Sequence, residues 1–119
     1  MLQDIQKILK PGGLILILVP NIDGLVNRIL QKNAVAFAGY THVNFFNHNT
    51  LSKILKINKF KTLHFETIFT EINSINNYLN FLDPYSDDGK KNLDLFTPEM
   101  IHKNFLGSKL LMIAKSLRK

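Results

Sequence analysis

His42 is the side chain of this sequence best suited to moving a proton. It precedes an expected helix, and an imidazole titrates near neutral pH, so it could orient or deprotonate a hydroxyl or an amine. Asn21 follows Pro20 at the end of an apolar run, where an amide could line a ligand site, and Tyr40 and Asn44 could form part of a substrate wall. Each has a structural alternative: His42 as a hydrogen-bonded packing residue beside aromatic residues, and Asn21 as a turn residue.

Other chemistries lack the residues that they need. The chain has no cysteine, which excludes thiol nucleophiles, disulfides and cysteine-ligated metals. His48 and His64 have no partners at the spacing of metal ligands, so we expect no metal site. No serine stands in a nucleophile elbow, so hydrolase chemistry is not supported.

The elements that must position His42 and Asn21 begin with a helix and a buried strand. Apolar residues at helical spacing predict a helix over residues 2–9, and Lys10-Pro11-Gly12-Gly13 predicts a turn. Residues 14–19, Leu-Ile-Leu-Ile-Leu-Val, are apolar without alternation. This pattern predicts a strand that is covered on both faces in a parallel sheet.

The rest of the chain alternates between helices and strands. The patterns predict helices over residues 24–32, 49 or 50–57 and 71–82, an exposed loop over 85–95, a short helix opening at Thr97-Pro98-Glu99, and strands over 60–69 and 109–116.

Three segments in this order resemble class I S-adenosylmethionine-dependent methyltransferases. Residues 8–13, Ile-Leu-Lys-Pro-Gly-Gly, with the strand after them and Val19-Pro20-Asn21, are similar to the "LKPGG" segment and fifth strand of that family. Residues 41–46, followed by Thr50-Leu51, Ile54-Leu55 and Phe60, resemble its "H-x-x-F-F, T-L, L-L, G-F" pattern. The two last strands would be the antiparallel pair that closes the family's sheet. The chain departs from the pattern at Asn58-Lys59, where the family usually has a small residue and glycine.

The resemblance implies an α/β fold: the C-terminal part of a Rossmann-like methyltransferase sheet, with about three strands and flanking helices. Residues 1–119 would form a single partial domain, in which 1–70 carry the main elements, 71–106 an insert of helix and loop, and 107–119 the final strand. The family binds S-adenosylmethionine through a glycine-rich loop after its first strand. No G-x-G triplet occurs here, and Gly12-Gly13 enters a strand rather than leaving one, so the cofactor-binding half is expected to be absent.

The resemblance therefore implies part of a methyltransferase for a small-molecule acceptor, expected to be inactive as an isolated chain. His42 would be catalytic, and Asn21, Pro20, Tyr40 and Asn44 would lie near substrate or cofactor. The alternative is a non-catalytic split or truncated remnant, an interaction module that pairs with a chain supplying the N-terminal half or with a second copy.

Charge and hydropathy limit the other partners. Lys and Arg number 15 against 9 Asp and Glu, a net charge of +6, but only Arg28 and Arg118 are arginines and the lysines are spread along the sequence. Base readout and bidentate phosphate contacts favour arginine, which argues against a nucleic-acid partner. The longest apolar run is six residues, far below the roughly 20 of a membrane-spanning helix. We therefore expect no membrane partner and a cytoplasmic protein.

Overall fold

The computed structural model describes residues 1–87 and 93–119. In chain order the elements are α1 (Leu2–Ile8), β1 (Leu14–Pro20), α2 (Leu25–Leu30), the 3₁₀ turns η1 (Gln31–Asn33) and η2 (Val35–Phe37), α3 (His48–Ile57), β2 (Phe60–Ile68), α4 (Ile72–Leu79), α5 (Pro98–Lys103) and β3 (Lys109–Ser116). Most of the predicted elements are confirmed, and the last strand has its predicted bounds. Of the expected loop over 85–95, residues 88–92 lie outside the described part of the chain.

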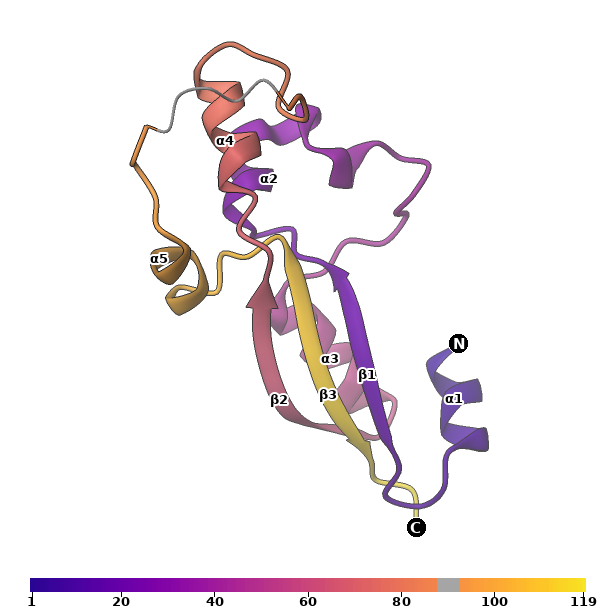
Figure 1. Cartoon of the computed structure of the whole chain (residues 1–119). Helices are drawn as coiled ribbons and strands as arrows, with labels where there is room; N and C mark the ends of the chain where they lie inside the picture. Colours follow the sequence, from indigo (N-terminus) through magenta and orange to yellow (C-terminus); the bar gives the residue numbers. More distant parts are fainter. Residues whose placement is uncertain (88–92) are drawn as a thin grey trace.

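The three strands form one sheet in the order β1-β3-β2 (Figure 1). The central strand β3 runs antiparallel to both neighbours, and its Ile113 pairs with Leu16 of β1 and with His64 of β2. Because both outer strands oppose β3, they run in the same direction. Their carboxyl ends therefore lie at the same end of the sheet. Together with the helices, this small antiparallel sheet gives the chain an α/β fold.

The expectation that β1 is covered on both faces and lies in a parallel sheet is wrong for the described chain. Ile15, Ile17 and Val19 pack against the core, whereas Leu14, Leu16 and Leu18 are 57%, 65% and 49% exposed. The cause lies in the layers: α1 and α3 pack their apolar residues against one side of the sheet, and among the described strands β1 is at the edge and pairs with β3 alone. The pattern of residues 14–19 indicates apolar side chains on both faces of the strand, but it does not indicate whether a second layer covers each face.

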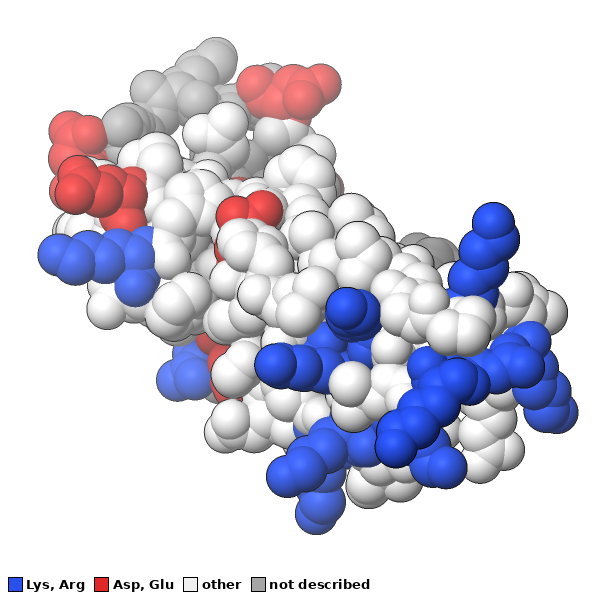
Figure 2. Space-filling model, turned by 90° about the horizontal axis from the view of Figure 1, so that it is seen from below, with Lys and Arg blue, Asp and Glu red and all other residues white. Residues whose placement is uncertain are grey.

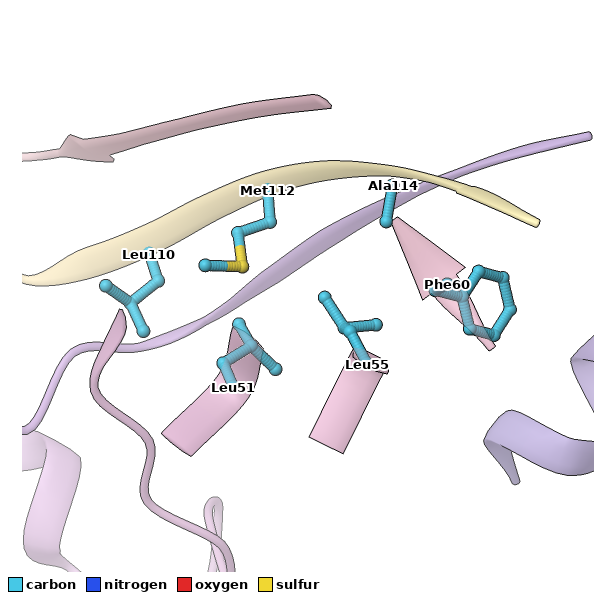
Figure 3. Packing of buried hydrophobic residues seen from close by; sticks show 6 residues of the cluster. All are labelled: Leu51, Leu55, Phe60, Leu110, Met112 and Ala114. Atoms are coloured by element: carbon cyan, nitrogen blue, oxygen red, sulfur yellow. The ribbon is translucent and has the colours of Figure 1, made fainter. Parts of the chain in front are cut away.

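The main core lies between the sheet and α3. Leu51 and Leu55 of α3 pack against Leu110, Met112 and Ala114 of β3, and Phe60 closes the cluster at the start of β2 (Figure 3). All of these side chains are buried. Leu51 and Leu55 are four residues apart, which places them on one face of α3, and alternate residues of β3 point to the same side of the sheet.

A second, separate cluster lies beyond the carboxyl ends of β1 and β2. It joins Val26 and Leu30 of α2 to Ile75 of α4, with Ala34 from the loop after η1. Figure 1 shows α2 and α4 side by side above the two strand ends. The molecule thus has a sheet-and-helix body and a helical cap, and the junction between them is where a cavity can form.

Candidate functional site

A cavity of about 840 Å³ opens at the junction between the sheet and the helical cap. This volume lies in the range of small-molecule sites. Polar and apolar residues share the lining: Asn27, Thr41, His42, Thr70, Glu71, Asn73, Ser108 and Lys109, with Val35, Ala36, Phe69, Ile72, Phe96 and Pro98. The position agrees with the rule that α/β sheets bind ligands outside the carboxyl ends of their strands.

Close backbone contacts build the junction at the start of β3. A Cβ on Gly107 would lie 2.7 Å from the carbonyl oxygen of Ile68, and one on Gly24 would lie 3.0 Å from the carbonyl oxygen of Gly107. The distance at Gly107 is shorter than a side chain allows, so only glycine fits there, and the contact at Gly24 is tight enough that a side chain would require its neighbour to shift. The two glycines let the end of β1, the end of β2 and the start of β3 meet within one layer.

Asn21 connects the end of β1 to the loop before β3 through hydrogen bonds. Its side-chain amide donates to the carbonyl oxygens of Gly107 at 2.9 Å and Phe105 at 3.3 Å. Its Oδ1 accepts from the backbone N–H of Asp23 at 3.1 Å, and its backbone carbonyl accepts from Nδ2 of Asn27 at 2.7 Å. Asn21 is fully buried and does not line the cavity, whereas Asn27 does. Asn21 therefore acts on the cavity through Asn27 and the loop before β3.

Backbone contacts hold the segment that contains His42 beside the end of β1. The N–H of Ile22 donates to the carbonyl oxygen of Phe46 at 2.9 Å, and Asn21 and Phe46 form an isolated parallel bridge. This bridge fixes the segment that follows His42 beside the end of β1. The half-buried His42 and its neighbour Thr41 then form part of the cavity wall.

The other predicted site residues do not join His42. Pro20 is buried at the end of β1, and Tyr40 and Asn44 are exposed, Tyr40 by 82%. None of these three residues lines the cavity. Any role that they have in binding stays a prediction.

Several residues that line the cavity are not among the site residues predicted from the sequence. Glu71 follows the end of β2, and the strand-end rule that drew attention to Asn21 could have found it. Ser108 and Lys109 precede and begin an antiparallel strand, where that rule gives no signal. Phe69 and Glu71 have positive φ angles of 60° and 51°, a conformation that costs energy in residues other than glycine.

The electrostatics of the cavity are set by two opposite charges. Within the described residues, neither Glu71 nor Lys109 has an ion-pair partner within 4.0 Å.

Tyr85 lies near the cavity. Burial raises the pKa of its phenol, the negative charges of Glu71 and Asp83 raise that pKa further, and the N–H of Val35 lowers it. That N–H donates to the Tyr85 oxygen at 2.7 Å.

Among the described residues, the side chains that could bind a metal ion are dispersed, and Gly12 lies in a turn. In residues 1–87 and 93–119, no group of three or more His, Asp or Glu side chains is arranged to hold a metal ion. Gly12 has a φ of 72° in the turn before β1, at the end of the strand opposite the cavity. The N–H of Gly13 donates to the carbonyl oxygen of Lys10 at 2.8 Å, which closes the predicted turn.

No family model matches the chain, and no curated protein or solved structure matches it either. None of the helices in the described ranges has the length and apolar character needed to cross a membrane.

Proposed function

We propose that this chain is the C-terminal part of a cytoplasmic S-adenosylmethionine-dependent methyltransferase that acts on a small-molecule acceptor. The observation that carries the proposal is the cavity at the carboxyl ends of β1 and β2, with His42 in its wall. Two further features support it: the order of the three sequence segments that resemble the family, and the antiparallel pairing of the last two strands, which the resemblance expects.

In the proposed reaction, bound S-adenosylmethionine supplies an electrophilic methyl group on a sulfonium. With that donor bound, the acceptor atom would take the methyl group, and the sulfur would leave with the electrons of the carbon–sulfur bond. This chain binds and aligns the acceptor, and the His42 imidazole takes the acceptor's proton where one is lost. The residues that hold the methyl donor come from outside these 119 residues, since the chain has no glycine-rich loop.

Titration calorimetry of the isolated chain with S-adenosylmethionine tests this division of labour. We expect no binding heat, because the donor's main binding motif is absent. Tight binding by the chain alone would contradict the proposal that the cofactor half lies elsewhere. The nucleotide sequence just upstream of the Met1 codon gives a second test: we expect a glycine-rich loop encoded in frame or after one frameshift, and its absence would count against the proposal.

Replacing His42 tests the chemical role. In a full-length context, His42→Ala should lower turnover by about 100-fold, the lower end of what a positioned acid or base contributes. Stability should change little, because the side chain is only half-buried. The matched control is His64→Ala, since His64 lies on β2 outside the cavity. Unchanged turnover in His42→Ala would remove His42 from the mechanism.

The exposed row on β1 favours a second candidate function, a non-catalytic interaction module. Leu14, Leu16 and Leu18 present apolar side chains on an edge strand, and such strands pair readily with another chain. In this alternative the protein works by associating with a chain that supplies the N-terminal half or with a second copy. The two candidates separate by activity, because only the first predicts loss of methyl transfer in His42→Ala.

A further inference from the structure

Two unpaired charges of opposite sign line the same cavity. Glu71 and Lys109 are both half-buried, and within the described residues neither has an ion-pair partner within 4.0 Å. Partly burying a charge without a partner costs free energy, and a ligand charge of the opposite sign reduces this cost. The cavity therefore offers one site to a cation and one to an anion.

The two charges come from different elements. Glu71 lies between the end of β2 and the start of α4 and lines the cavity. Lys109 begins β3, where its Cα pairs with Pro20 on one side and Ile68 on the other. A ligand that contacts both charges therefore bridges the segment after β2 and the start of β3.

A buried hydroxyl beside Lys109 adds a further polar contact. Ser108 is 4% exposed and lines the cavity, and its Oγ is the one buried side-chain polar atom of the described residues without a hydrogen-bond partner. An orphaned buried hydroxyl is costly in a native structure, and a bound ligand would satisfy it. Phe69, Ile72 and Phe96 supply apolar wall around these polar groups.

We infer that the cavity binds a small zwitterion, a molecule with an ammonium group and a carboxylate on an apolar body. Glu71 binds the ammonium, Lys109 binds the carboxylate, Ser108 donates or accepts a hydrogen bond, and the apolar wall contacts the body. That this zwitterion is the methyl acceptor rests on the proposed function. Its binding does not.

Three probes of one shape test the inference on the intact chain: L-phenylalanine, phenethylamine, which lacks the carboxylate, and 3-phenylpropionate, which lacks the ammonium. Affinities are measured by titrating each into the isotope-labelled protein and following amide chemical shifts. We expect L-phenylalanine to bind about fivefold more tightly than either single-charge probe, as a partly exposed ion pair contributes. The shifts should concentrate on residues that line the cavity.

Variants assign each charge to its residue. Glu71→Gln should abolish the preference for L-phenylalanine over 3-phenylpropionate, and Lys109→Gln the preference over phenethylamine. Glu66→Gln and Lys61→Gln, on β2 away from the cavity, should leave both preferences unchanged. The inference would be overturned if the unmodified protein bound the three probes with equal affinity, bound none of them, or showed shifts only on other surfaces. These outcomes are measured on the unmodified protein, so they hold even if a variant fails to fold.

The experiment separates this inference from the proposed function, because it contains no methyl donor. Charge-dependent binding of L-phenylalanine would support the zwitterion site even if the full-length protein transferred no methyl group. Methyl transfer to a neutral acceptor, without charge-dependent binding, would support the proposed function and overturn the zwitterion site.

Discussion

Asn21 shows how far a single residue can be interpreted from sequence. Its position after an apolar strand predicts a place near a ligand site, and the cavity does lie at that strand end. Its bonding could not be predicted, because the amide donates to Phe105 and Gly107, 84 and 86 residues further along the chain. Such contacts depend on the assembled fold rather than on local spacing.

Asn21→Ala should destabilise the protein by about 2–3 kcal/mol, because buried carbonyl groups lose their donors. Gly107 and Phe105 would lose the side-chain amide, and the N–H of Asp23 would lose its acceptor. Urea unfolding measures the change. Asn44→Ala is the matched control, since Asn44 is exposed, and equal unfolding free energies of the two variants would contradict the role given to Asn21.

Tyr85 gives a pH-dependent prediction at the same scale. Burial raises its pKa above the ordinary value of 10.0, so the folded state favours the neutral phenol. The resulting contribution to stability is fully present below pH 10 and is lost as the pH rises through the pKa of the folded state. Glu71→Gln should lower that pKa, because the nearby negative charge is removed, whereas Glu66→Gln should not. Ultraviolet absorbance titration measures both, and equal shifts would show that Glu71 does not act on Tyr85.

Among the elements, α3 shows what local patterns do and do not fix. Apolar spacing predicts a start at residue 49 or 50, but α3 begins at His48. Asn47 is the reason: its side chain accepts from the N–H of Thr50, and the Thr50 side chain accepts from the N–H of Asn47. This capping box is readable from sequence only once the first helical residue is known.

Asn47→Ala should lower the free energy of unfolding by about 1 kcal/mol, the usual value of an N-cap. The loss should appear in global unfolding, because α3 carries Leu51 and Leu55 of the main core. Asn49→Ala, two residues further into the helix, keeps the cap and should change stability by less than about 0.5 kcal/mol. Denaturant melts followed by circular dichroism compare them, and matching midpoints would show that the capping box contributes nothing.

At the scale of the whole molecule, the sequence predicts the order of the helices and strands better than it predicts which residues meet in the cavity. The cavity draws on Glu71, Ser108 and His42 from distant segments, and their meeting depends on strand order. The lysines, spread along the sequence, gather in space: Figure 2 shows Lys and Arg concentrated toward one end and Asp and Glu toward the other. One groove near the C-terminus is lined by Lys7, Lys59, Arg118 and Lys119.

The exposed side chains of Leu14, Leu16 and Leu18 on β1 predict that the protein self-associates at high concentration. Leu16→Lys should reduce self-association, since a charged side chain on an edge strand opposes pairing, and packing of the inner face should be preserved because Leu16 points away from the core. Light scattering after size exclusion measures the mass across concentrations. The loop variant Val43→Lys, at a position that is also exposed, should behave like the unmodified chain. A monomer at every concentration would contradict the prediction and count against pairing with a second copy.

The same row of leucines bears on how long the protein survives in a cell. Chaperones and proteases sort chains by the apolar, extended segments that they expose, and β1 exposes such a segment even in the folded state. Cellular abundance is therefore expected to depend on whether another polypeptide covers β1, more than on the free energy of unfolding. Supply of that polypeptide would then control how much of this chain accumulates.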